Sequence, residues 1–139
     1  AIDKAFQDSE KDKINFLPLY FDASNPSSNL GWDDSERKSL KERADFDGVI
    51  ALAFKHHLAI AKNIPLEKAI KWIMFLAPKG LIEFVPKNDE TIQKMLELKG
   101  DIFADYNKEN FEKYVSKFGK IIMKDVISES GRTIYEFQR

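Results

Sequence analysis

The chain has 139 residues, of which 43% are hydrophobic, a length that supports one hydrophobic core rather than two. Its 22 basic and 23 acidic residues leave a formal charge of −1, so no overall field favours nucleic acid or an anionic membrane. Because cysteine is absent, disulfides, thiolate metal sites and cysteine nucleophiles are excluded, and we expect a reducing, cytoplasmic location. The apolar runs are too short to span a bilayer, and the charged first residues do not resemble a signal peptide.

The first third of the chain predicts a helix, a strand and a polar connection. Apolar residues at helical spacing predict a short surface helix at the start. The run "INFLPLYF", residues 14–21, predicts a strand, which we place at a sheet edge because Pro18 cannot donate to a ladder. Residues 23–45 form a long polar connection with a short helix that mostly faces water.

The remainder of the chain alternates between strand and helix patterns. The continuous apolar run of residues 46–54 is typical of a strand covered on both faces of a parallel sheet. After it the patterns predict a helix over 63–77, whose apolar stripe from Leu66 to Ala77 is expected to be core. A strand over 80–87, helices over 88–100 and 107–119, and a final hairpin over 120–139 follow.

This order predicts an α/β fold in a single domain over residues 1–139. We expect an open, mostly parallel, Rossmann-like sheet with helices on both faces and a carboxyl-terminal antiparallel hairpin. In such sheets ligands bind beyond the carboxyl ends of the strands. A site is therefore expected among "DASN" after the first strand, "FKHHL" after the second and "EFVPK" at the third.

Five segments in this order resemble a known family. They are "FDASNPSSNLGW", "FDGVIALAFKHHLAI", "LIEFVPK", "DIFADYNKENFEKYV" and the final "GRTIYEF". Together they are similar to the carboxyl-terminal half of a class I S-adenosylmethionine-dependent methyltransferase, in particular a bacterial group whose fourth strand ends in an "HHL" step. The resemblance covers essentially the whole chain. It implies S-adenosylmethionine as the cofactor and a methyl acceptor that the sequence does not identify.

One feature of that family is absent from these residues. Class I methyltransferases open with a strand and a glycine-rich GxG loop, because close backbone approach to the cofactor leaves no room for side chains. The six glycines stand at positions 31, 48, 80, 100, 119 and 131, so no two are separated by a single residue. We therefore interpret the chain as a partial methyltransferase-like domain, truncated at its amino-terminal side.

The resemblance assigns three residues to the cofactor, namely Asp22, Ala23 and Phe54. The Asp22 carboxylate would accept a hydrogen bond from the adenine amine. The alternative is that Asp22 only caps the turn that follows it.

The resemblance also places His56, His57 and Glu83 beside the acceptor, as candidates for a general base among which the sequence does not choose. The histidines are adjacent and therefore point apart, so they are a poor chelating pair and no metal site is predicted. Their alternative is a hydrogen-bonded position between strand and helix. On the substrate side, Lys87 and Tyr106 would approach the acceptor, with a solvated charge pair as the alternative for Lys87.

Two functions from different classes are consistent with these patterns. The first is the acceptor-side portion of a methyltransferase, inactive as this fragment, so that whether the chain alone is an enzyme stays open. The alternative is a non-catalytic α/β interaction module that self-associates as a homodimer through strand edges exposed by the missing strands.

Overall fold

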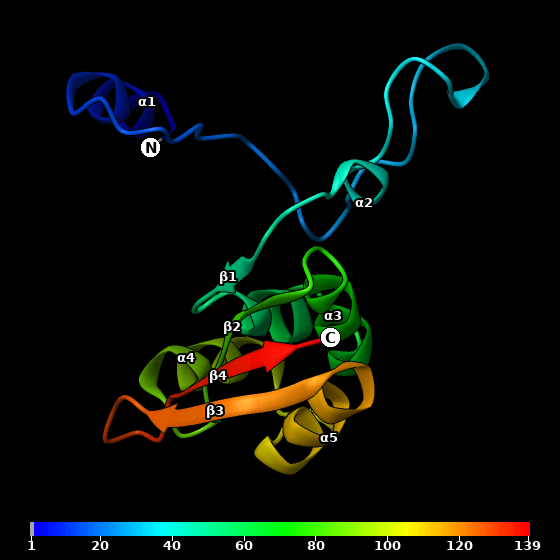
Figure 1. Cartoon of the computed structure of the whole chain (residues 1–139). Helices are drawn as coiled ribbons and strands as arrows, with labels where there is room; N and C mark the ends of the chain where they lie inside the picture. The colour runs from blue at the N-terminus through cyan, green and yellow to red at the C-terminus, as the bar shows by residue number, and fades with distance from the viewer. Residues whose placement is uncertain (1) are drawn as a thin grey trace.

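A computed structural model describes residues 2–139, and a four-stranded sheet organises the chain from residue 49 onward (Figure 1). The strands are β1 (Val49–Ala51), β2 (Lys79–Phe84), β3 (Lys120–Val126) and β4 (Thr133–Gln138), in the spatial order β1-β2-β4-β3. β1 and β2 are parallel, whereas β4 is antiparallel to both of its neighbours. β3 therefore runs parallel to β2, and the carboxyl ends of β1, β2 and β3 lie at one edge of the sheet. The expected α/β class and the final hairpin are confirmed.

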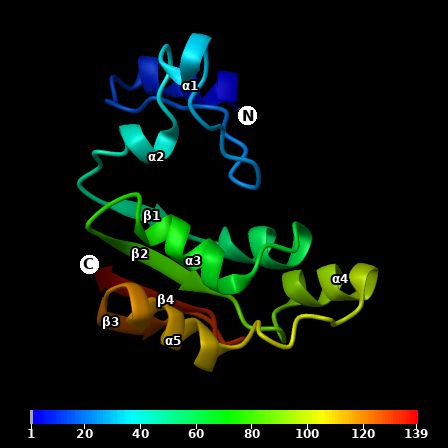
Figure 2. The same ribbon diagram turned by 90° about the vertical axis from the view of Figure 1, so that its right-hand side faces the viewer.

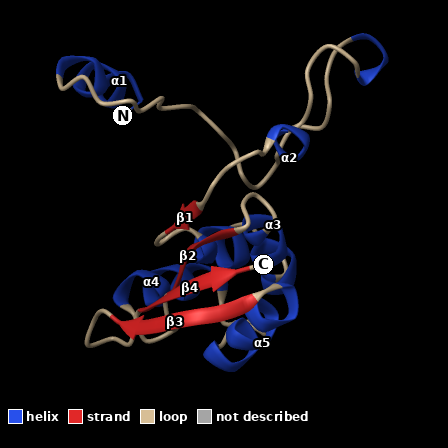
Figure 3. Cartoon of the chain, in the orientation of Figure 1, coloured by secondary structure: helices blue, strands red, loops and turns tan. Residues whose placement is uncertain are grey.

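Helices cover one face of this sheet (Figures 1, 2 and 3). α3 (Leu66–Met74) and α5 (Lys108–Phe118) contact each other, α3 also contacts β1, and α5 contacts β3. α4 (Glu90–Lys99) packs against η2 (His57–Ala61), a π-helical turn. The α3 stripe that the sequence predicts as core is buried, and it meets aromatic side chains from the strands and α5; the largest buried members of this core include Ile70, Ile73, Met74, Ile82, Phe84, Phe111, Tyr135 and Phe137.

The opposite face of the sheet is covered by no helix of residues 2–139, so the expectation of helices on both faces is not met (Figure 2). A row of paired residues crosses this face from Ile50 through Leu81 and Glu136 to Met123. Ile50 is 71% exposed and Met123 is 50% exposed. Apolar side chains on a sheet face are normally buried against a second layer. This face of the sheet is therefore not covered by a second layer within residues 2–139.

Residues 2–47 form an arm that extends away from the sheet (Figures 1 and 2). The arm contains α1 (Ile2–Lys11), a 3-10 turn η1 (Trp32–Asp34) and α2 (Leu40–Arg43), so a short first helix and a short helix in the polar connection are confirmed. The arm meets α3 where the Phe21 ring stacks on Trp72, with ring centroids 5.9 Å apart and planes 3° from parallel.

The strand expected at residues 14–21 is wrong. This segment pairs with no strand of the described chain, and Leu17, Leu19 and Tyr20 are 68%, 72% and 84% exposed. A strand exists only when a neighbour accepts its backbone hydrogen bonds, and Pro18 removes one donor from this segment. The strand pattern is present in the sequence, but its partner is missing from the described residues.

The strand expected over residues 46–54 is much shorter than its apolar run, because only Val49–Ala51 pair with β2. Within residues 2–139 no helix is both long enough and apolar enough to cross a membrane.

Gly80 provides a test of the β1–β2 contact. A Cβ added at Gly80 would collide with the Val49 carbonyl oxygen and would lie 2.7 Å from Val49 Cγ1. We expect Gly80→Ala to lower the free energy of unfolding by about 1–3 kcal/mol, because overpacking must displace β1. Gly48→Ala is the control, since the nearest atom to its added Cβ is 3.7 Å away. Urea unfolding of the two variants measures the effect, and equal midpoints would contradict the packing.

Candidate functional site

The chain leaves the sheet sharply after β1, at Ala53. Ala53 has a φ of 49°, a left-handed conformation that is uncommon for a residue with a Cβ. Its N–H donates to Oε2 of Glu83, which lies in the neighbouring strand β2. A conformation of this kind typically costs about 1–3 kcal/mol and persists where its surroundings enforce it. The Glu83 carboxylate is the group that holds this turn.

The other oxygen of Glu83 binds the hairpin between β3 and β4. Arg132 Nε donates to Glu83 Oε1 at 2.7 Å, and Glu83 is only 3% exposed. Arg132 Nε also lies 4.0 Å from Asp89 Oδ2, which accepts a hydrogen bond from the Ser130 hydroxyl at 3.0 Å. Five residues from four segments thus form one polar network at the carboxyl edge, which we call the Glu83 cluster: Ala53, Glu83, Asp89, Ser130 and Arg132.

Asp89 ties this cluster to helix α4, of which it is the N-cap. Its Oδ1 accepts the N–H of Thr91 at 3.0 Å. Burial opposes ionisation of the carboxyl, but the hydrogen bonds from Thr91 and Ser130 and the charge of Arg132 hold the pKa of Asp89 below its ordinary value. The cluster therefore contains two carboxylates and the guanidinium between them.

His56 lies beside this cluster and is 2% exposed. Neither of its ring nitrogens has a hydrogen-bond partner among residues 2–139. Burial lowers the pKa of His56 to about 4, and the positive charges of His57, Lys55 and Arg132 act in the same direction. The imidazole is therefore neutral at pH 7, and one of its ring nitrogens can accept a hydrogen bond. The neighbouring His57 is exposed, but its ring lies against that of His56, with the centroids 4.3 Å apart, so the expectation that the two side chains point apart is wrong.

Lys55 precedes His56 and is almost completely buried, at 1% exposure. Its Nζ lies 4.2, 4.6 and 4.4 Å from the ring centroids of Phe84, Tyr106 and Phe111, and no atom of the described chain accepts a hydrogen bond from it. Burial lowers the pKa of Lys55 well below its ordinary value, which the charge of Glu83 only partly opposes. The three ring faces compensate in part for the lost hydration of the amine.

The geometry distinguishes two of the three residues that the sequence offers as bases, Glu83 and His56, while His57 is exposed. Both carboxylate oxygens of Glu83 are engaged, so Glu83 acts as a clamp between β2, the turn after β1 and the hairpin. His56 is buried, and its ring nitrogens make no hydrogen bond within the described residues. Both residues lie where the carboxyl ends of β1 and β2 meet, the edge at which open α/β sheets bind ligands.

The remaining predicted site residues are more scattered. Asp22 lies in the arm, where its Oδ1 accepts from the Ser24 N–H and hydroxyl at 2.9 and 2.6 Å, as expected of a turn cap. Phe54 packs against the edge of the core. Lys87 forms an ion pair with Asp101 at 2.6 Å.

Tyr106 is 2% exposed, and its hydroxyl donates to the Val85 carbonyl oxygen at 2.8 Å, so it is a core residue in this structure. The cofactor roles of Asp22, Ala23 and Phe54 and the acceptor roles of Lys87 and Tyr106 stay predictions. In the described part of the chain, no three His, Asp or Glu side chains come close enough together to hold a metal ion.

Lys55, Asp89 and Arg132 are the residues that sequence reasoning missed. The sequence does contain a sign of Lys55, because a lysine inside an apolar run next to the histidines indicates a buried charged side chain. Arg132 carries none, since the turn that holds it is separated from β2 by two helices and a strand.

Comparison with known proteins gives one relative. The chain is 50% identical over all of its 139 residues to a protein named Nodulation protein NoeA from Rhizobium meliloti (strain 1021). It spans 29% of the length of that relative. No family model matches the chain, and no solved structure matches it.

The low pKa of His56 generates a prediction about pH. The unfolded histidine, with a pKa near 6.5, binds a proton that the folded one refuses until about pH 4, so stability falls as pH is lowered between these values. We expect His56→Gln to lose part of this fall and His57→Gln, which changes an exposed ring, to retain most of it. Urea midpoints between pH 7 and 4 measure the slopes. Identical slopes for wild type and His56→Gln would contradict the burial of a neutral imidazole.

The Glu83 clamp generates a second prediction. We expect Glu83→Ala to lower the free energy of unfolding by about 2–4 kcal/mol, because it leaves the Ala53 N–H and the Arg132 guanidinium without their acceptor. The control is Glu90→Ala, which removes an ion pair with Lys94 between two exposed side chains and should cause no measurable change. Chemical unfolding at pH 7 compares the two, and an effect of Glu83→Ala no larger than that of the control would show that the clamp is not a structural support.

Proposed function

We propose that the chain is the acceptor-side, carboxyl-terminal portion of a class I S-adenosylmethionine-dependent methyltransferase. The observation that carries the proposal is His56, a buried neutral imidazole without a partner in the described residues, at the carboxyl end of a strand in a parallel pair. Methyl transfer requires an acceptor held in line beside the cofactor in a site that excludes water. A buried neutral imidazole that can accept a hydrogen bond at this edge of the sheet suits that requirement.

The sheet supports the proposal as well. The resemblance implies parallel strands that are finished by an antiparallel hairpin, and here β1 and β2 are parallel while the hairpin β3–β4 completes the sheet. The hairpin also brings Arg132 to the carboxyl edge, so that it contributes to the site and does not merely terminate the sheet.

The truncation is the second part of the proposal. The outer edge of β1 has no partner strand within residues 2–139, and one face of the sheet lacks a helical layer there. A Rossmann-like parallel sheet would continue on that edge and would carry helices on that face. The relative named Nodulation protein NoeA is more than three times as long as this chain, since the match spans 29% of it. The strands that bind most of the cofactor would lie in sequence outside these residues.

The residues present fit part of S-adenosylmethionine. A hollow of about 290 Å³ beside β1 is lined by Phe21 and Phe54 among others, and Phe21 precedes the proposed adenine contact Asp22. Aromatic side chains suit a flat adenine ring, and the outer oxygen of Asp22 is available to its amine because Ser24 occupies only Oδ1. The glycine-rich loop for the amino-acid part of the cofactor is absent from the 139 residues.

In this mechanism the cofactor supplies a methyl group already activated by the positive sulfonium. The task of this chain is to hold the acceptor in line with the methyl group. The unprotonated ring nitrogen of His56 would accept a hydrogen bond from a hydroxyl or amine acceptor and so orient it. The Glu83 cluster would keep the turn that carries His56 in place. Because the chain has no disulfide that would need an oxidising compartment, it is compatible with the reducing cytoplasm, where we place this activity.

A second function, a non-catalytic module that forms homodimers, is favoured by a different observation. The β1 edge has no partner in the described chain, and Ile50 on it is 71% exposed. Exposed strand edges tend to pair with other chains. The two functions make opposite predictions about the cofactor.

The test is calorimetric titration of S-adenosylhomocysteine into this chain and, in parallel, into the full-length relative from Rhizobium meliloti. We expect micromolar binding by the full-length protein and at least about tenfold weaker binding by the 139-residue chain, because most cofactor contacts lie outside it. Binding by neither protein would refute the methyltransferase. Light-scattering mass measurement would then decide on the module, which requires a dimer.

A further inference from the structure

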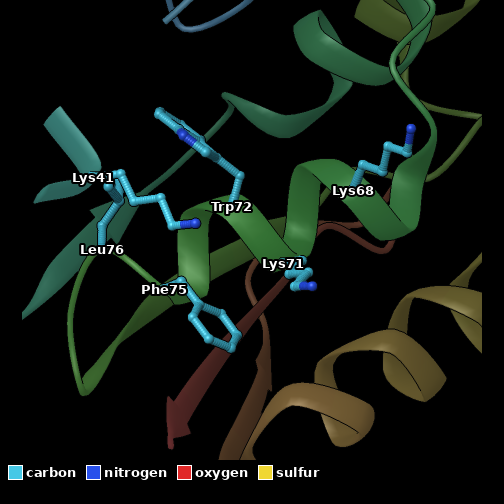
Figure 4. Close-up of a pocket in the computed structure, with 6 residues that line it drawn as sticks. All are labelled: Lys41, Lys68, Lys71, Trp72, Phe75 and Leu76. Carbon is cyan, nitrogen blue, oxygen red and sulfur yellow. The ribbon is translucent and has the colours of Figure 1, made fainter. Parts of the chain in front are cut away.

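A second pocket lies between α2 and α3, away from the His56 site (Figure 4). Its volume is about 310 Å³, and it is lined by Lys41, Lys68, Lys71, Trp72, Phe75 and Leu76. The carboxyl end of α3 leads directly to the start of β2, whereas His56 follows the end of β1. The pocket therefore lies toward the amino edge of the sheet. It shares Trp72 and Leu76 with the hollow that the methyltransferase proposal assigns to adenine, whereas its three lysines line this pocket alone.

The three lysines give this pocket positive charge. No carboxylate of residues 2–139 lies within 4.0 Å of the amines of Lys41, Lys68 or Lys71. Glu67, the acidic residue adjacent to Lys68 on α3, is bound to Lys117 at 2.6 Å. Like charges one helical turn apart repel each other, and the chain as a whole carries a charge of −1. A bound anion would relieve this repulsion.

Two aromatic rings accompany the charges. In Figure 4 the side chain of Lys41 reaches from α2 so that its ammonium lies between Trp72 and Phe75, while Lys68 and Lys71 point outward from α3. Phe21 stacks on Trp72 and thereby restricts the indole, with 5.9 Å between the ring centroids. The Lys71 Nζ lies 5.9 Å from the Phe75 centroid. Flat apolar surface and positive charge are thus presented together.

We propose that this pocket binds a planar aromatic anion, of which a nucleoside monophosphate is the representative class. The ring of such a ligand would lie against Trp72, and its phosphate would be reached by the amines of Lys41 and Lys71, which bind phosphate as point charges. Small-molecule pockets range over about 300–1,000 Å³, so a volume at the lower end suits one nucleotide rather than a dinucleotide. The site adjoins the hollow proposed above for adenine, so the lysine variants, and not the Trp72 signal alone, distinguish the two.

The test follows the indole N–H signals of the ¹⁵N-labelled chain by NMR. The chain has two tryptophans, so Trp32, which is 84% exposed in the arm, serves as an internal control for Trp72. Adenosine monophosphate is titrated, with adenosine and inorganic phosphate in separate samples. We expect a saturable shift of the Trp72 signal with adenosine monophosphate, at least about tenfold weaker binding of adenosine or phosphate alone, and no shift of Trp32.

Charge-removing variants complete the test. We expect Lys41→Gln and Lys71→Gln each to weaken binding of adenosine monophosphate about three- to tenfold. Lys113→Gln, which removes an exposed charge from α5, should leave it unchanged. An unshifted Trp72 signal, equal binding of adenosine, or equal loss in all three variants would overturn the proposal. Binding only of an acidic peptide or of single-stranded nucleic acid would overturn it too, because either would assign the surface to a macromolecule.

Discussion

The hydrogen bonds of the Glu83 carboxylate are the constraint on which the candidate site depends. This one side chain joins the turn after β1, strand β2 and the β3–β4 hairpin, through the Ala53 N–H and the Arg132 guanidinium. Ala53 adopts a left-handed conformation that its own sequence does not favour, so the turn is held by a contact from another strand. The position of His56, three residues further on, follows from that turn.

The same edge of the sheet contains two basic side chains, Lys55 and His56, that are buried without hydrogen bonds in the described part of the chain. Lys55 and His56 are 1% and 2% exposed, and their side-chain nitrogens find no acceptor or donor within residues 2–139. A buried polar group without a hydrogen bond costs free energy, and the rings around Lys55 offset only part of that cost. Burial also lowers the pKa of both residues, that of His56 to about 4. Buried ionisable groups that cost free energy in this way are common at functional sites.

Periodicity correctly predicted those elements whose apolar spacing alone shows which side is buried. The stripe on α3, the strand β2 and the final hairpin all appear as expected, because apolar spacing alone determines which side of each element must be buried. Residues 14–21 have an equally good strand pattern, but a strand depends on a partner as much as on its own sequence. The expected helices on the second face fail for a related reason, since covering a face requires sequence that the described chain does not contain.

For the site, the rule that ligands bind at carboxyl ends correctly brought His56 and Glu83 to the same edge. The rule could not show that both Glu83 oxygens are occupied by hydrogen bonds, whereas the His56 nitrogens make none within the described residues. That distinction depends on which hydrogen bonds each group makes, and the decisive partner of Glu83 is Arg132, which enters the site from a turn far along the chain. A long-range ion pair of this kind has no local pattern, whereas the apolar run that contains Lys55 does.

The open sheet and the arm pose one physical problem. Leu17, Leu19 and Tyr20 in the arm and Ile50 on β1 all expose apolar surface, and a strand that paired with β1 would begin to cover both. In a methyltransferase that cover would come from further sequence of the same protein, and in an interaction module it would come from a second copy. Both answers satisfy the same edge with the same backbone hydrogen bonds, so the sheet alone does not decide between them. The difference lies at His56. An enzyme could use a neutral imidazole that has no partner in the described chain to orient a substrate through a hydrogen bond, whereas a partner-binding module has no such use for it.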